Sequence, residues 1–151
     1  MCDAWAISGS SHSVNDPMRW IRSLEAFVRV VIDEGQPLVG ICFGHQLIAR
    51  ALGGTVRSHS SWSLGVKRVS LEAEASRLFG GTDFLNLVHS HREIVTEIPR
   101  GATVIGHTQS CPTAMVSFSP NALGIQGHPE MTAAYARNLI EDRRGDVIFG
   151  L

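Results

Sequence analysis

The spacing of apolar residues along the chain predicts strands that alternate with helices. Apolar runs at residues 3–8, 37–42 and 122–126 have the length of buried strands, and shorter runs at 103–105 and 114–118 are bounded by turn residues. Strands separated by helical segments are typical of an α/β fold, whose sheet is parallel where helices connect its strands. We therefore expect one α/β domain with a mixed, largely parallel sheet and flanking helices.

A helix is expected between the first two strand runs. Asp16 and Pro17 have the properties of an N-cap and a first helical residue, so the helix is expected to begin there. Gly35 is expected to end it, because glycine readily adopts the left-handed backbone conformation that follows many helices. The apolar residues of one helical face are Trp20, Ile21, Leu24, Phe27, Val28 and Val31.

The central and C-terminal parts of the chain contain shorter patterns of apolar and polar residues, which predict further strands and helices. The polar residues His89–Glu93 follow an apolar run and are expected to form a turn. A last helix is expected to begin after Thr132 as its N-cap and to end near Arg143. Its inward residues are expected to be Ala136, Leu139 and Ile140. The remaining expected elements are strands at 55–57, 65–72, 84–88 and 94–95 and a helix at 73–79.

The strand run at 37–42 ends in Gly40-Ile41-Cys42-Phe43-Gly44, and a helical pattern over residues 46–52 follows. Glycines two residues before and after a cysteine let a strand and a helix approach closely at a sharp turn, as in a nucleophile elbow. The backbone N–H of Phe43 would lie at the helix N-terminus, where partial positive charge favours a thiolate and later an oxyanion. The alternative is an inert, buried cysteine.

A second motif, Gly127-His128-Pro129-Glu130, follows the run at 122–126. The residue before proline is held extended, so the side chains of His128 and Glu130 are expected to point to the same side. Glu130 can then hold one ring nitrogen while the other accepts a thiol proton. Together the motifs favour a Cys-His-Glu triad over unrelated structural residues. His45 is interpreted as structural, because His128 has the better orienting partner.

Gly-Ile-Cys-Phe-Gly-His-Gln at 40–46, together with Gly-Ile-Gln-Gly-His-Pro-Glu at 124–130, resembles the class I glutamine amidotransferase domains. The resemblance is greatest to stand-alone proteins similar to the amidotransferase part of GMP synthase, and it covers nearly the whole chain. It implies a flavodoxin-like sheet, with Cys42 as the nucleophile, His128 as the base and Glu130 as its partner. It also implies that no metal or organic cofactor is needed.

The same resemblance implies how substrate is bound. Gly9 and Ser10 would supply the second oxyanion donor beside Phe43, and Gln46 would contact the substrate amide. Ser11 stands where the family commonly has proline, which predicts a less rigid loop over residues 9–15. Contacts to the α-amino and α-carboxylate groups would come from Ser90, Arg92 and Glu93, for which a solvated loop is the alternative.

Composition narrows the class of protein. A net charge of −1 and a pI of about 6.6 give no case for binding nucleic acid or an anionic membrane. The three cysteines are far apart and odd in number, which argues against a disulfide framework, and the seven histidines lack compact zinc-ligand spacing, so no metal site is expected. A thiol nucleophile needs a reducing compartment, and neither a signal peptide nor a spanning segment is visible, so a cytoplasmic protein is expected.

The family usually has a further strand-helix-strand unit before the position of Asp3. The resemblance therefore implies that residues 1–151 form a single, N-terminally shortened domain. The strand at 3–8 would then have an unpaired edge, and we expect either self-association through that edge or poor solubility with impaired activity.

These features predict hydrolysis of the glutamine side-chain amide. Because no phosphate-binding glycine-rich motif is present, the acceptor for ammonia is expected on a partner protein. A close alternative is a γ-glutamyl peptide hydrolase, whose site must admit a substituent on the amide nitrogen. A third is a non-catalytic module of the same fold that binds a partner or a metabolite.

Overall fold

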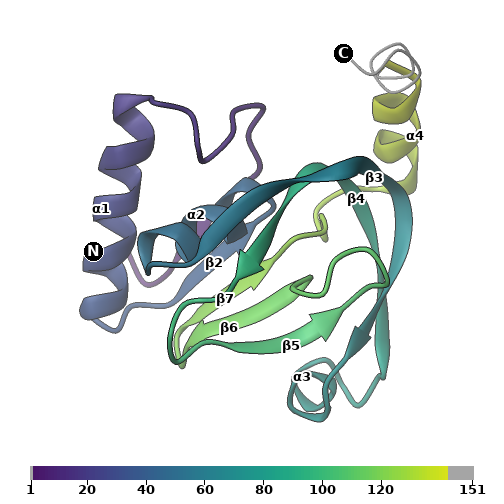
Figure 1. The fold of residues 1–151 in the computed structure, drawn as a ribbon. Helices are drawn as coiled ribbons and strands as arrows, with labels where there is room; N and C mark the ends of the chain where they lie inside the picture. The colour runs from purple at the N-terminus through teal and green to yellow at the C-terminus, as the bar shows by residue number, and fades with distance from the viewer. Residues whose placement is uncertain (1, 143–151) are drawn as a thin grey trace.

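The structure, a computed structural model, describes residues 2–142 and contains a seven-stranded sheet within them. The strands follow the order β1-β2-β7-β6-β5-β3-β4 across the sheet, and Figure 1 shows β3 and β4 arching over its far half. The strands are β1 (Trp5–Ile7), β2 (Leu38–Ile41), β3 (Thr55–Leu71), β4 (Phe84–Glu97), β5 (Thr103–His107), β6 (Met115–Ser119) and β7 (Ala122–Ile125). The helices are α1 (Arg19–Asp33), α2 (Phe43–Ala51), α3 (Ala73–Leu78) and α4 (Ala133–Asp142).

The expected mixed α/β sheet is confirmed, but its parallel part is smaller than expected. β1 pairs with β2 and β2 with β7 in parallel, as expected around the elbow. The pairings β7–β6, β6–β5, β5–β3 and β3–β4 are all antiparallel. The physical reason is the connections: one helix, α1, joins β1 to β2, whereas β6 and β7 are joined by a tight turn that permits only antiparallel neighbours.

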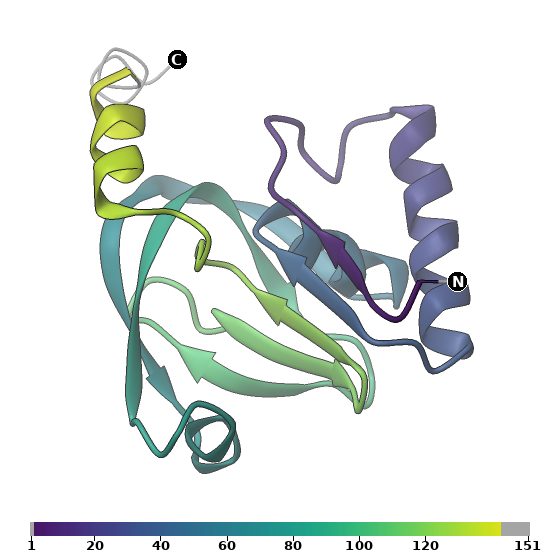
Figure 2. The same ribbon diagram turned by 180° about the vertical axis from the view of Figure 1, so that it is seen from behind.

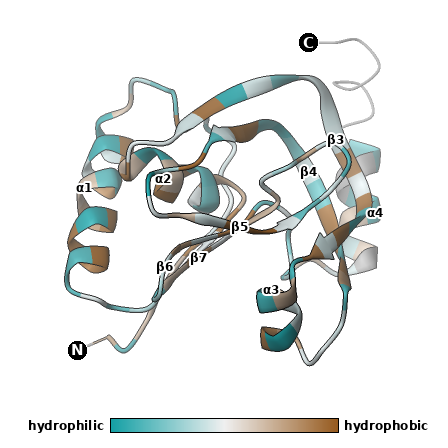
Figure 3. Ribbon diagram, turned by 60° about the horizontal axis from the view of Figure 1, so that its bottom comes forward, coloured by the Kyte–Doolittle hydropathy of each residue, from teal (hydrophilic) through white to brown (hydrophobic). Residues whose placement is uncertain are grey.

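Two apolar clusters cover the two faces of the sheet. α2 packs on β1, β2 and β7, and α1 packs on α2 (Figure 2). Successive residues of β6 point to opposite faces, so Val116 belongs to the cluster under α1 and α2, and Met115 to the cluster on the other face beside α3. Figure 3 shows hydrophobic and hydrophilic residues on different sides of α1, as its apolar spacing predicted. The exception on the predicted face is Trp20, which is 40% exposed.

The predicted start of the first helix was wrong. α1 begins at Arg19, after Met18 with extended φ and ψ of −89° and 135°. The carboxylate of Asp16 instead accepts a hydrogen bond from the backbone N–H of Ser13 at 3.1 Å, so it stabilises the preceding loop and is not available as a helix cap. The predicted end is confirmed, because Gly35 follows α1 with a positive φ of 67°.

The central strands were predicted too short. Residues 55–57 and 65–71 belong to one continuous strand, β3, whereas Glu72 is the N-cap of α3, and the expected turn His89–Glu93 lies within β4. These polar residues remain extended because β3 supplies their backbone partners along most of the ribbon. A β-bulge interrupts the pairing: between the pairs Ser58↔Glu93 and Ser63↔His91, four residues of β3 stand opposite Arg92 alone.

The ends of the described chain lie far apart along the sheet. Thr132 caps α4 as predicted, accepting a hydrogen bond from the Tyr135 N–H at 3.2 Å. The predicted helix end near Arg143 lies outside the described residues, as do the side chains of Leu139 and Ile140, whereas Ala136 is buried. None of the described helices is long and apolar enough to cross a membrane.

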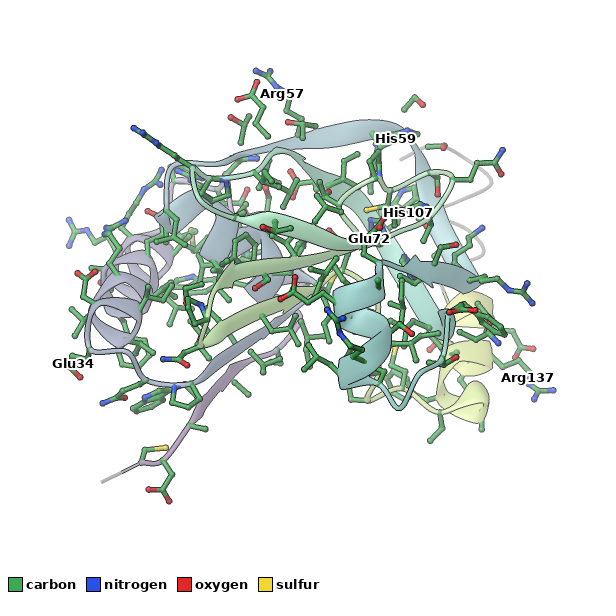
Figure 4. All side chains as sticks on the ribbon, turned by 90° about the horizontal axis from the view of Figure 1, so that it is seen from below. Glu34, Arg57, His59, Glu72, His107 and Arg137 are labelled. Carbon is green, nitrogen blue, oxygen red and sulfur yellow. The ribbon has the colours of Figure 1, made fainter. Side chains whose placement is uncertain are left out.

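The two edges of the sheet differ. At one edge, β1 pairs only with β2 among the described strands, so the predicted unpaired edge is present in residues 2–142. Near the other end of the sheet, Glu72 and His107 lie side by side on the surface, with 3.5 Å between their carboxylate and ring nitrogen (Figure 4).

Candidate active site

Cys42 occupies the sharp turn between β2 and α2. Its φ of 52° and ψ of −101° make it the one non-glycine residue with positive φ in the described chain, a strained conformation that lifts its side chain out of the turn. Gly40 and Gly44 permit this turn. A Cβ atom at Gly40 would lie 2.5 Å from the Gly44 backbone, and one at Gly44 would collide with the carbonyl oxygen of Ile7. The sulfur-bearing residue is itself 8% exposed.

His128 and Glu130 project together from the segment after β7. Nδ1 of His128 lies 2.7 Å from Oε1 of Glu130, and since a carboxylate only accepts, Nδ1–H is the donor and Nε2 is left to take a proton. The backbone N–H of His128 donates to the Val88 carbonyl at 2.8 Å, which fixes the ring against β4. A Cβ atom at Gly9 would lie 3.1 Å from Cε1 of His128 and 3.8 Å from Cβ of Cys42, so both side chains flank the same point.

A cavity of about 520 Å³ opens beside these residues. All ten residues that the sequence predicted for the site line it: Cys42, His128, Glu130, Gly9, Ser10, Phe43, Gln46, Ser90, Arg92 and Glu93. They come from the turn between β2 and α2, from α2, from β4, from the segment after β7 and from the loop after β1. His45 does not line this cavity, in agreement with its structural interpretation.

The loop over residues 9–15 is held by side chains, although Ser11 replaces proline. The Ser13 hydroxyl donates to the Glu93 carboxylate at 2.8 Å. Arg50 of α2 donates to the Val14 carbonyl and to the Asn15 side chain. Val14 is fully buried beneath the loop. These contacts attach the loop to β4 and α2 at Ser13, Val14 and Asn15, whereas the predicted loss of rigidity at Ser11 stays a prediction.

A chain of amide groups runs behind the cavity. Nε2 of Gln46 lies 2.8 Å from the Glu93 carbonyl oxygen and 3.1 Å from Oε1 of Gln126. Nε2 of Gln126 in turn lies 3.6 Å from the Cys42 sulfur. Gln126 is fully buried and lies in the 124–130 stretch that carries the family resemblance, but the sequence predicted no role for it.

Three buried histidines underlie the site in neutral form. Burial, helped by the charge of His91, lowers the pKa of His45 to about 3. Burial, followed by the charges of His91, His128 and Lys67, lowers the pKa of His89 to about 3. Burial lowers the pKa of His91 to about 4, although its hydrogen bond to the Glu93 carbonyl opposes the shift. Nδ1 of His89 and Nε2 of His91 are hydrogen-bonded to each other at 3.0 Å.

A side cavity of about 150 Å³ adjoins the main one, and the two share Trp62, His91 and Arg92 as wall residues. Trp62 belongs to the bulge of β3, so the bulge forms part of the wall between the two cavities. Lys67 and Arg92 line the side cavity, and none of its described wall residues is acidic. The predicted strands at 55–57 and 65–72 left this segment between them, and the sequence prediction gave it no role in the site.

Within residues 2–142, no group of three or more histidine, cysteine, aspartate or glutamate side chains is arranged to hold a metal ion.

Comparison with known proteins agrees with the motifs. Residues 2–143 match the family model described as glutamine amidotransferase class-I. The chain is 34% identical over 154 residues to γ-glutamyl peptidase 4 of Arabidopsis thaliana, covering 98% of this chain and 60% of that protein. It is 40% identical over 103 residues to a GMP synthase (glutamine-hydrolyzing) of Clostridium acetobutylicum, covering 67% of this chain and 20% of that protein.

A solved structure confirms the fold class. The crystal structure of a glutamine amido transferase from Methylobacillus flagellatus superposes with a TM-score of 0.88 at 28% identity, covering 96% of this chain and 59% of the other. The chain spans about three fifths of the length of this structure and of the Arabidopsis relative.

Proposed function

Because the chain belongs to the class I glutamine amidotransferase family, we propose that it hydrolyses the side-chain amide of glutamine through Cys42, His128 and Glu130. The observation that carries the proposal is the contact of 2.7 Å between Glu130 and His128, in a cavity that Cys42 also lines. A carboxylate that fixes one imidazole nitrogen beside a cysteine at a strained turn is the arrangement of an activated thiol nucleophile.

The first half-reaction forms a thioester. Nε2 of His128 takes the thiol proton, and the Cys42 sulfur attacks the side-chain carbonyl carbon of glutamine. Negative charge then develops on the carbonyl oxygen, where the N–H of Phe43, at the start of α2, and an N–H of the Gly9–Ser10 segment stabilise it. His128 returns the proton to the amide nitrogen, the carbon–nitrogen bond breaks, and ammonia leaves.

The second half-reaction releases glutamate. His128 takes a proton from a water molecule, whose oxygen attacks the thioester carbon. The carbon–sulfur bond breaks, and the sulfur recovers a proton from His128. Throughout, the Glu130 carboxylate stabilises the imidazolium that forms in each step.

Substrate contacts are proposed for the residues on the β4 side of the cavity. Gln46 has both amide hydrogens engaged, so its oxygen is the group that can accept a hydrogen bond from substrate. Ser90 and Arg92 offer a hydroxyl and a cation for the α-carboxylate. The Glu93 carboxylate is already bonded to Ser13, so its proposed role is to hold the Gly9–Asn15 loop and to interact with the α-ammonium by charge.

Ammonia released in this cavity would serve an acceptor on another protein, and we propose a synthase as that partner. The support is the similarity of residues in this chain to the amidotransferase part of GMP synthases. A free-standing hydrolase is the alternative outcome.

Ammonia release from glutamine by the purified protein tests the proposal, with Cys42→Ala as the matched variant. Stoichiometric glutamate and ammonia from the parent protein, and none above background from the variant, is the expected result. Absence of release from the parent, with Cys42 still reactive and glutamine still bound, would instead support a non-catalytic binding module.

A second candidate is hydrolysis of γ-glutamyl peptides by the same triad. The observation that favours it is the side cavity with Lys67 and Arg92, which gives room and positive charge for a substrate larger than glutamine. The similarity to γ-glutamyl peptidase 4 agrees with this. Comparing kcat/KM for glutamine and γ-glutamylglycine separates the candidates, and Lys67→Met should raise the KM for the peptide several-fold while leaving glutamine unaffected if the peptide carboxylate binds there.

A further inference from the structure

We infer that Gln126 is a further catalytic residue, whose side-chain amide donates a hydrogen bond to the Cys42 sulfur and holds it as a thiolate. This inference rests on the proposed role of Cys42 as the nucleophile. Gln126 is fully buried at the end of β7, and its N–H donates to the Ala114 carbonyl at 2.8 Å. Next to it, the Ile125 carbonyl accepts the N–H of Cys42 at 2.8 Å, so the two residues are held side by side through their backbones.

The backbone carbonyl of Glu93 determines how the side-chain amides of Gln46 and Gln126 are oriented. The backbone oxygen of Glu93 can only accept, so the Gln46 atom 2.8 Å from it is the nitrogen. That nitrogen also lies 3.1 Å from the Gln126 side chain, whose nearer atom must then be its oxygen.

The remaining end of the Gln126 amide is therefore the nitrogen, 3.6 Å from the Cys42 sulfur. An amide nitrogen has only hydrogens to offer, so the sulfur is the acceptor. Reversing the amide would set N–H against N–H at Gln46 and a carbonyl oxygen against the sulfur. The network thus permits one orientation, and that orientation is complementary to a negatively charged sulfur.

A buried donor stabilises the thiolate relative to the thiol, because hydrogen bonds to a charged acceptor are stronger than those to a neutral one. Gln126 transfers no proton, so the proton accounting of the proposed reaction stays with His128. The donor also restricts rotation of the sulfur about the Cα–Cβ bond, which positions it for attack. Cys42 is then held from two sides, by the start of α2 and by Gln126.

The test is the pH dependence of Cys42 alkylation by iodoacetamide, read for each cysteine by peptide mass spectrometry. Gln126→Met has similar length but no donor, and Gln126→Glu keeps an acceptor toward Gln46 but turns an ionisable oxygen toward the sulfur. In both variants the midpoint for Cys42 should rise by about one pH unit. The exposed Cys2 in the same sample should be unchanged and serves as the internal reference.

Turnover gives the second readout. The kcat for glutamine should fall about tenfold to a hundredfold in either variant, with a smaller change in KM, because the donor acts on the nucleophile and not on substrate. Thr113→Val is the matched control: it removes a buried hydrogen bond of 2.6 Å to Val95 that lies outside the cavity lining, and its Cys42 midpoint should equal that of the parent.

An unchanged Cys42 midpoint in a folded Gln126 variant, confirmed by its thermal unfolding, would overturn the inference. Alkylation needs no turnover, so this outcome is distinct from failure of the proposed glutamine hydrolysis. If the parent alkylates with a low midpoint and releases no ammonia, the role of Gln126 at the sulfur stands while the substrate assignment fails.

Discussion

The two halves of the sheet hold their functional residues in different ways. Around β2 and β7, the backbone itself defines the site. The strands are parallel, Gly40 and Gly44 lie against neighbouring backbone, and Cys42 has a strained conformation. Together these features restrict Cys42 to one position. In the β3–β4 ribbon, side-chain hydrogen bonds and an irregular strand define the substrate side of the site. His89 and His91 are hydrogen-bonded to each other, and the Glu93 carbonyl oxygen accepts from both His91 and Gln46. The bulge of β3 shapes the wall opposite them. The comparison predicts that changes to the first half act on chemistry, and that changes to the second act on substrate binding.

The largest effect is expected at the imidazole. His128→Ala removes the group that carries the proton and should lower kcat for glutamine by about ten-thousandfold. Glu130→Gln keeps an acceptor beside the ring but loses the charge that stabilises imidazolium, so its loss should be about tenfold to a thousandfold. Steady-state kinetics of both variants measure this, and a parent-like rate for Glu130→Gln would show that the third member of the triad is misassigned.

Glycine substitutions test whether the backbone around the nucleophile is packed more tightly than a strand away from it. Gly44→Ala should reduce the free energy of unfolding by about 3 kcal/mol or more, since its Cβ meets the backbone carbonyl of Ile7, which cannot move aside. Gly106→Ala in β5, which lies outside both regions, should cost about 1 kcal/mol, because the nearest atoms there are side chains of Met115 and Val69 at 3.1 Å. Urea denaturation measures both, and equal losses would contradict the tighter backbone packing around Cys42.

Thiol reactivity should separate the three cysteines. A glutamine-like electrophile is expected to label Cys42 at least about tenfold faster than the others at neutral pH, because a helix N-terminus and an imidazole favour its thiolate. Burial raises the pKa of Cys111 to about 11, which keeps it protonated and unreactive. Mass spectrometry of the labelled protein decides; equal labelling of all three in the folded state contradicts the assignment of the nucleophile.

The buried histidines predict acid sensitivity in both halves. Folded His45 and His89 have pKa values of about 3, below the value of about 6.5 in the unfolded chain. The unfolded state therefore binds more protons below pH 6.5, and the protein loses stability as pH falls from about 6.5 toward 3. His89→Gln should flatten this dependence by up to about 1.4 kcal/mol per pH unit, measured as urea midpoints from pH 7 to pH 4.

The smallest effect is expected at the sheet edges. Within residues 2–142, the outer edge of β1 has no strand beside it and carries an exposed alanine, Ala6, whereas the β4 edge carries charged residues such as Arg92 and Glu97. We therefore expect weak, concentration-dependent self-association through β1, which Ala6→Lys should reduce. Light scattering over a wide concentration range measures the association, and a monomer at every concentration would contradict self-association through β1.

The sequence predicted the nucleophile half because its signals are local. Two glycines around Cys42 and a proline between His128 and Glu130 each restrict the backbone nearby, and the structure has the turn and the contact that follow. The roles of these residues, and those of the substrate side, stay predictions. The β3–β4 ribbon was mispredicted because its polar stretch is extended only through pairing with distant residues, and Gln126 was missed because its partners come from α2 and β2.

The bulge of β3 offers a segment whose length can be varied to change which substrates the protein accepts. Four residues stand there against one, and the antiparallel pairing of β3 with β4 resumes beyond the bulge in a shifted register, so the strand absorbs added length while both sides stay paired. Length at this point is thus a variable independent of the nucleophile. A library that shortens or lengthens residues 59–62 would sample new cavity shapes at constant reaction chemistry, and selection on substrates of increasing size could act on that single segment.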